Sequence, residues 1–182
     1  MNSKNKKIFI GIVISLFVVL NIYNIPLTGV DEDYKKINNN EIISKSNLNL
    51  DDLYKSIKNS STKEYNFKNY DSLLISFWAT WCPSCKSENK IFNSFMKKNQ
   101  QTLIIGICMD RDKNALTEYL KSNEINFDTL NITKEISKLF DDIVAVPTHF
   151  IINNSNGSYI KELGLLTENE LNSYIEQVQQ IK

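Results

Sequence analysis

Two cysteines separated by two residues, in the segment Cys82-Pro83-Ser84-Cys85, are the side chains best suited to chemistry. They follow an apolar run, residues 73–77, that predicts a buried strand, and they precede a pattern that predicts a helix. The N-terminus of a helix has unpaired N–H groups and a partial positive charge, and both favour a thiolate. We therefore expect Cys82 to be the exposed nucleophile and Cys85, one turn later, to be the buried resolving thiol. Pro83 suits the first helical turn, because a backbone N–H at that position would have no hydrogen-bond partner within the helix.

A pair of cysteines with this spacing also occurs in zinc sites and in structural disulfides. Zinc needs about four ligands, and the sequence offers only one more cysteine, Cys108, and one histidine, His149, neither in a paired spacing. A disulfide across two residues closes a very small loop and restricts the unfolded chain little. Because a zinc site and a structural disulfide both fit poorly, the sequence favours a redox-active pair, which needs no metal and no organic cofactor.

Two separate segments resemble one known family. Residues 77–85, Phe-Trp-Ala-Thr-Trp-Cys-Pro-Ser-Cys, resemble the active-site segment of thioredoxin-fold proteins. With Glu88 three residues later, the segment looks most like the TlpA/ResA-type branch, which includes thioredoxin-like proteins of cytochrome c maturation. Residues 146–152, Val-Pro-Thr-His-Phe-Ile-Ile, resemble the cis-proline strand of the same fold. The similarity extends from about residue 73 to the C-terminus, and it implies thiol–disulfide exchange by the two cysteines.

The resemblance also implies an acid–base role for Glu88. In thioredoxins a buried acid lies six residues before the first cysteine, but this chain has Ser76 there, which cannot act as a base at neutral pH. Glu88 lies one helical turn after Cys85 and is the candidate replacement. The alternative is an ordinary glutamate on a solvent-facing helix surface.

The same resemblance implies a substrate-binding surface. The bond between Val146 and Pro147 is expected to be cis and to face the cysteine pair, with the Val146 backbone pairing with an extended substrate. The alternative is a trans proline that begins an edge strand. Trp81 is expected to cover the disulfide and Trp78 to pack beneath it, although both also suit a core. The expected substrate-binding residues are Trp81, Pro83, Ser84, Val146 and Pro147.

The third cysteine, Cys108, lies inside an apolar run, residues 103–109, that predicts a central strand. A buried free cysteine usually behaves as a small hydrophobic residue. A third redox-active thiol is the alternative.

The N-terminus predicts a membrane anchor. Three lysines at positions 4, 6 and 7 precede an apolar stretch that continues to residue 25, near the lower limit for a membrane span. A cleaved signal peptide is the alternative, although no small-residue cleavage site follows. Because lysines favour the cytoplasmic side, we expect a single-pass protein of the cytoplasmic membrane with its catalytic domain outside. The expected division is an anchor at 1–25, a linker at 26–47 and a thioredoxin-like domain at 48–182.

The periodicity of the remaining chain predicts an α/β fold. Strands are expected at 73–77, 103–109, after Pro147 and at 158–163, with a less clear strand at 64–67; helices are expected at 50–59, 83–99, 112–123, 133–140 and after a capping box, Thr167 to Glu170. Helices between the early strands require parallel neighbours, whereas the turn at 153–157 joins a hairpin. The expected architecture is a central mixed β-sheet flanked by helices, plus the N-terminal transmembrane helix.

These features predict an extracytoplasmic thiol–disulfide oxidoreductase, most simply a reductant of protein disulfides, with cytochrome c maturation one possible setting. Its partners would be protein substrates and an unidentified membrane redox protein. Lysines and arginines number 21 and aspartates and glutamates 21, and this zero net charge argues against nucleic acid. A copper(I)-binding or carrier protein that uses the same thiols is the alternative.

Overall fold

The computed structural model describes residues 43–44, 48–140 and 143–181. Six strands form one sheet in the order β1-β6-β5-β2-β3-β4. The central strand β2 is parallel to β3 and antiparallel to β5, so the sheet is mixed, as the sequence predicted. The strands are β1 (Ile43–Ser44), β2 (Ser72–Trp78), β3 (Thr102–Cys108), β4 (Asp128–Asn131), β5 (Thr148–Asn153) and β6 (Tyr159–Leu163).

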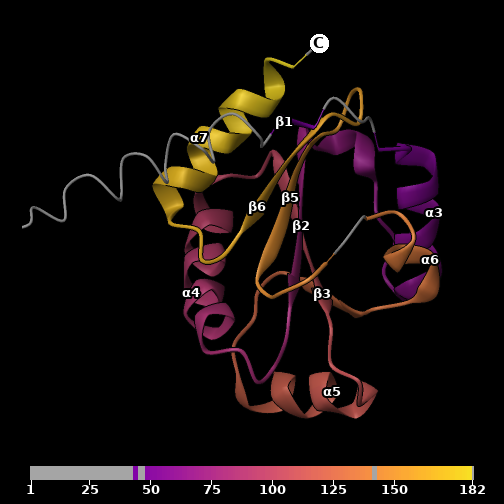
Figure 1. The fold of residues 1–182 in the computed structure, drawn as a ribbon, viewed down its shortest axis with the longest axis vertical. Coiled ribbons are helices and arrows are strands. Elements are labelled where there is room, and N and C mark those ends of the chain that lie inside the picture. Colours follow the sequence, from indigo (N-terminus) through magenta and orange to yellow (C-terminus); the bar gives the residue numbers. More distant parts are fainter. Residues whose placement is uncertain (1–42, 45–47, 141–142, 182) are drawn as a thin grey trace, which may run out of the picture. The chain divides into compact units, whose positions relative to one another are not determined.

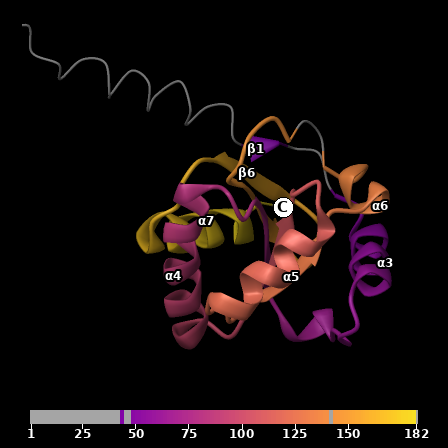
Figure 2. The same ribbon diagram turned by 90° about the horizontal axis from the view of Figure 1, so that it is seen from below.

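Helices cover both faces of this sheet (Figures 1 and 2). One face carries α4 and α7, and the other carries α3 and α6, in both views. The helices are α3 (Leu50–Ser60), the 3₁₀ helix η2 (Phe67–Asn69), α4 (Pro83–Lys98), α5 (Lys113–Ser122), α6 (Lys134–Ser137) and α7 (Glu168–Gln179).

Alternation along β2 divides the core between the two faces. Leu73, Ile75 and Phe77 pack with residues of α3 and α6. Leu74 packs on the opposite face with residues of α4 and α7. Every residue of β2 is buried, and all but Ser72 and Ser76 are apolar, so the strand was easy to predict from its sequence.

Capping side chains lie at the start of four helices. The side chains of Asn49, Asp112, Thr133 and Thr167 each accept a backbone N–H at the start of a helix. Thr167 and Glu170 form the predicted capping box. At α4 the corresponding position is occupied by Cys82, whose sulfur accepts the N–H of Cys85.

Several predicted elements need correction. The strand expected at 64–67 is absent, since residues 64–66 have no regular structure and Phe67 begins η2. The helix expected at 133–140 is shorter than predicted. Thr133 is its N-cap, and only the four residues Lys134–Ser137 are helical. Strand β4 was not predicted, since its sequence, Asp-Thr-Leu-Asn, has a single apolar residue. Two residues of the expected linker, Ile43 and Ser44, form β1 and pair with β6.

The predicted membrane anchor at residues 1–25 lies outside the described residues. Within the part of the chain that is described, no helix combines the length and apolar character needed to span a membrane.

Candidate active site

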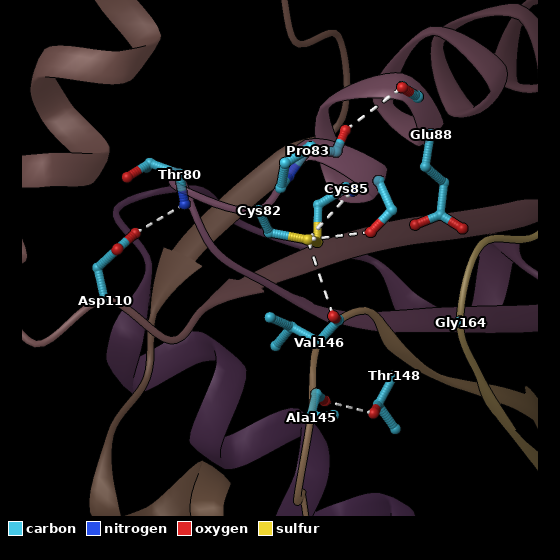
Figure 3. Close-up of a disulfide and its surroundings, with 12 residues drawn as sticks. Thr80, Cys82, Pro83, Cys85, Glu88, Asp110, Ala145, Val146, Thr148 and Gly164 are labelled. Carbon is cyan, nitrogen blue, oxygen red and sulfur yellow. Dashed lines mark hydrogen bonds between the residues drawn. A yellow bond between two sulfur atoms is a disulfide. The ribbon is translucent and has the colours of Figure 1, made fainter.

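Cys82 and Cys85 form a disulfide at the N-terminus of α4 (Figure 3). The Cys85 N–H donates to Cys82 Sγ over 3.2 Å. The Ser84 hydroxyl lies 3.3 Å from the same sulfur and can donate to it, because a disulfide sulfur carries no hydrogen. Two donors of the first helical turn are thus aimed at Cys82 Sγ, an arrangement that would also stabilise a thiolate there.

Both cysteines are buried in this oxidised form. Cys82 is 3% exposed and Cys85 is 1% exposed, so the expectation of an exposed first cysteine is wrong here. Cys82 fills the N-cap position of α4 and packs in one cluster with Trp78 and Ala79. Trp78 therefore packs against the pair, as predicted.

The Val146–Pro147 bond is cis, as predicted. The carbonyl oxygen of Val146 lies 3.8 Å from Cys82 Sγ, and Figure 3 shows it directed at the disulfide. The Pro147 carbonyl accepts the Gly164 N–H over 2.9 Å, which ties this segment to the chain that follows β6. The two motifs recognised in the sequence therefore meet at Cys82.

An apolar depression lies beside the disulfide. It has a volume of about 170 Å³ and is lined by Trp81, Met109 and residues 143–146. Trp81 is 67% exposed and Val144 is 83% exposed, so large apolar side chains face solvent at its rim. Exposed aromatic and aliphatic groups around a reactive centre suit contact with a polypeptide.

Glu88 is buried, with 1% of its surface exposed, so the solvent-facing alternative is wrong. Its Oε1 accepts the Leu166 N–H over 2.7 Å and lies 3.1 Å from His149 Nε2. Figure 3 shows Glu88 descending from α4 toward the Gly164 segment. His149 was not predicted as a site residue, because its contact with Glu88 joins β5 to α4 and no local sequence pattern indicates it.

Asp110 is a second residue near the cysteine pair that was not predicted from the sequence. Its Oδ2 accepts the Thr80 N–H over 2.9 Å and the Cys108 thiol over 2.9 Å. The carboxylate therefore ties the loop before Cys82 to the end of β3 (Figure 3). Burial, followed by the hydrogen bond to Asp110, raises the pKa of Cys108 to about 12. At neutral pH this thiol is protonated, so it behaves as a small buried side chain.

The described residues contain no group of three or more histidine, cysteine, aspartate or glutamate side chains that could hold a metal ion. His149 Nε2 also lies 3.0 Å from the Gly164 carbonyl, so this nitrogen is already engaged by two acceptors.

Sequence comparison assigns the family. The model of the thioredoxin-like family matches residues 69–159, and the chain belongs to this family. The thiol-disulfide oxidoreductase ResA of Bacillus subtilis (strain 168) is 29% identical over 107 residues, which cover 57% of this chain and 59% of that protein. The sporulation thiol-disulfide oxidoreductase A of the same organism is 24% identical over 110 residues, covering 57% and 66% respectively. The chain thus spans under two thirds of the length of these relatives.

Solved structures share the fold. StoA from Bacillus subtilis aligns with a TM-score of 0.51 at 23% identity, covering 58% of this chain and 84% of that one. A thioredoxin-related protein from Neisseria meningitidis serogroup B aligns with a TM-score of 0.56 at 17% identity, covering 66% and 94%. The α/β fold with a central mixed sheet flanked by helices is therefore that of thioredoxin-like proteins.

Proposed function

We propose that this chain is a thiol–disulfide oxidoreductase that acts on protein substrates through Cys82 and Cys85. The observation that carries the proposal is the Cys82–Cys85 disulfide, which lies at the start of α4 with Cys82 Sγ facing the Val146 carbonyl. The relatives named as thiol-disulfide oxidoreductases support it.

The reduced pair would act in two steps. The Cys82 thiolate attacks a substrate disulfide, forms a mixed disulfide and releases one substrate thiolate, which takes a proton from solvent. Cys85 then loses its proton and attacks Cys82 Sγ, which expels the second substrate thiolate. The substrate disulfide is reduced to two thiols and the cysteine pair is oxidised to its disulfide. The reverse direction passes through the same intermediate.

Glu88 would accept the proton that Cys85 loses. The two residues are three positions apart on α4, a spacing that places them on one face of the helix, and both are buried. A buried carboxylate near a buried thiol offers a proton acceptor where solvent has little access.

The substrate would bind as an extended segment beside Pro147. The Val146 backbone, together with Pro83 and Ser84 at the mouth of α4, would contact the chain on each side of the substrate disulfide. The exposed apolar groups of Trp81 and Val144 would add contact area without demanding a particular sequence.

The direction and location of the reaction form the finer part of the proposal. The lysines before the apolar stretch support an anchor with the catalytic domain outside the cytoplasmic membrane. There the protein would reduce protein disulfides, and the TlpA/ResA-type resemblance makes the haem-site cysteines of apocytochromes one candidate substrate. A membrane redox protein would return the pair to its dithiol form.

Reduction of insulin by the full-length chain, with dithiothreitol as electron source, tests the activity. We expect the wild type to accelerate insulin precipitation and Cys82→Ser to abolish the acceleration, whereas Cys108→Ala serves as the matched control and remains active. An inactive wild type, or an active Cys82→Ser variant, would refute the proposal.

The reduction potential of the pair, measured against dithiothreitol or glutathione, tests the direction. A reductant should have a reduction potential of roughly −270 mV or lower, as thioredoxin has. A value near about −120 mV would instead assign an oxidase.

A further inference from the structure

His149 and Glu88 form a buried pair that joins β5 to α4. Nε2 of His149 lies 3.1 Å from Glu88 Oε1, and the two side chains are 0% and 2% exposed. The Phe92 ring packs edge-on against the imidazole, with ring centroids 5.9 Å apart. In the sheet register, His149 is directly opposite Ser76 of β2. His149 thus lies beside Ser76, which occupies the position of the buried acid in thioredoxins.

The hydrogen bonds to Glu88 converge on one oxygen. Oε1 receives the Leu166 N–H over 2.7 Å as well as the His149 contact. Among the described residues, no group donates to Oε2. Two donors at one oxygen fix the plane of the carboxylate and leave the second oxygen available to receive a proton.

The imidazole acts as a fixed donor. Nε2 is within hydrogen-bond distance of two acceptors, Glu88 Oε1 and the Gly164 carbonyl oxygen at 3.0 Å, so Nε2 carries the hydrogen. Nδ1 is buried and has no hydrogen-bond partner within the described chain. A ring with no partner at Nδ1 and no exposed surface has no onward route for a proton, so it can orient Glu88 but not pass a proton on to solvent.

We propose that His149 is a positioning residue for the second step of exchange, because it holds Glu88 so that Oε2 receives the proton of Cys85. This inference rests on the proposed function. In the mixed disulfide, the Cys85 proton moves to Oε2, directly or through one water molecule. Cys85 Sγ then bonds to Cys82 Sγ, and the substrate sulfur leaves as a thiolate, which recovers a proton from Glu88 or from solvent.

Other titratable groups face this pair. On α4 the nearest in sequence is Cys85 itself, and Cys108 of β3 belongs to the same cluster as Cys85. On β6, Glu162 is directly opposite His149 in the register. Tyr174 of α7 donates to Glu162 Oε2 over 3.1 Å, and burial, together with Glu162, raises the pKa of Tyr174 to about 12. Because Tyr174 and Cys108 remain protonated through neutral pH, neither of them contributes to a change in the pH profile there.

Stopped-flow reaction of the reduced full-length chain with 5,5′-dithiobis(2-nitrobenzoate) separates the two steps. Attack by Cys82 releases one coloured thiolate at a rate that depends on reagent concentration. Attack by Cys85 releases the second at a rate independent of that concentration. The second rate is measured from mildly acidic to alkaline pH in the wild type, His149→Asn, His149→Gln and the control Ile151→Val.

Asn and Gln differ by one methylene, and only the Gln amide reaches the place of Nε2. We expect His149→Asn to slow the second phase about tenfold or more at neutral pH and to approach the wild type at alkaline pH, where hydroxide removes the Cys85 proton. His149→Gln should restore most of the rate. Ile151→Val, on the same strand and the same face, should change neither phase.

Three results would overturn the inference: an unchanged His149→Asn profile, slowing by the same factor at every pH, or Gln as slow as Asn. If His149→Asn does not fold, His149→Thr, which suits a strand, replaces it in the same comparison. A wild type that shows no second phase would instead refute the proposed function, so the two failures are distinguishable.

Discussion

The three cysteines of this chain lie in one cluster, yet their surroundings give them different chemistry. Cys82 Sγ accepts an N–H from Cys85, so its surroundings suit a sulfur that carries negative charge. The Cys108 thiol instead donates to the Asp110 carboxylate, so its surroundings suit a sulfur that keeps its proton. Hydrogen-bond direction therefore distinguishes the proposed nucleophile from the buried thiol more clearly than burial does.

The Cys108 thiol should make stability depend on alkaline pH. Its pKa is about 12 in the folded chain, against about 8.5 for a free cysteine. Above about pH 8.5, ionisation of Cys108 lowers the free energy of the unfolded chain, whereas in the folded chain Cys108 stays protonated. The free energy of unfolding therefore falls as pH rises from about 9 toward 12. Between pH 8 and pH 10, wild type should lose about 1–2 kcal/mol more than Cys108→Ala in denaturant unfolding. Equal losses would contradict the assigned protonation.

The capping box of α7 is a test at the level of the elements. Thr167 Oγ1 accepts the Glu170 N–H over 3.2 Å, and Glu170 Oε2 accepts the Thr167 N–H over 2.9 Å. Thr167→Ala should lower the free energy of unfolding by about 1 kcal/mol, because it leaves N–H groups of the first turn without partners. Thr117→Ala, in an exposed position within α5, is the matched control and should be neutral or slightly stabilising. Equal effects of both substitutions, measured by denaturant unfolding, would contradict the role of the cap.

Elements with a dense apolar pattern could be predicted from the sequence, and those without one could not. Strands β2 and β3 are buried at every residue, and their apolar runs were sufficient to locate them. Strand β4 was missed because Leu130 is its only buried residue and the strand is recognisable only by its pairing with β3.

Some residues of the candidate site could be predicted from local sequence motifs, and others could not. The two cysteines and the cis proline were found through local motifs. His149 and Asp110 were missed because their contacts with Glu88 and Thr80 connect different elements. A sequence pattern reports the type of a residue and its neighbours along the chain, but a pairing across the sheet depends on the register.

At the scale of the whole molecule, the proposed location depends on the N-terminal segment. We expect the full-length chain to stay with membranes after a high-salt wash, because an apolar span is held by the hydrophobic effect and not by charge. Detergent should release it, and a reporter fused after residue 182 should be active only if it works outside the cytoplasm. Recovery of a shortened, soluble form would show instead that the segment is cleaved.

Two cysteines that lie within one helical turn have unequal roles in the proposed mechanism. In the proposed mechanism, Cys82 would meet the substrate beside the Val146 carbonyl, which lies 3.8 Å from its sulfur, and Cys85 would resolve the intermediate from its buried position. This asymmetry is the central claim, since the substrate surface and the proton acceptor each depend on it.

Capture of mixed disulfides tests that asymmetry most directly. Full-length Cys85→Ser and Cys82→Ser variants are reduced, freed of reductant and incubated with a disulfide-containing protein such as insulin. Covalent adducts are then quantified on non-reducing gels, with Cys108→Ala as control. Cys85→Ser should accumulate adducts through Cys82, because the resolving thiol is absent, and Cys82→Ser should form almost none. Equal trapping by the two variants, or trapping by Cys82→Ser alone, would contradict the assignment.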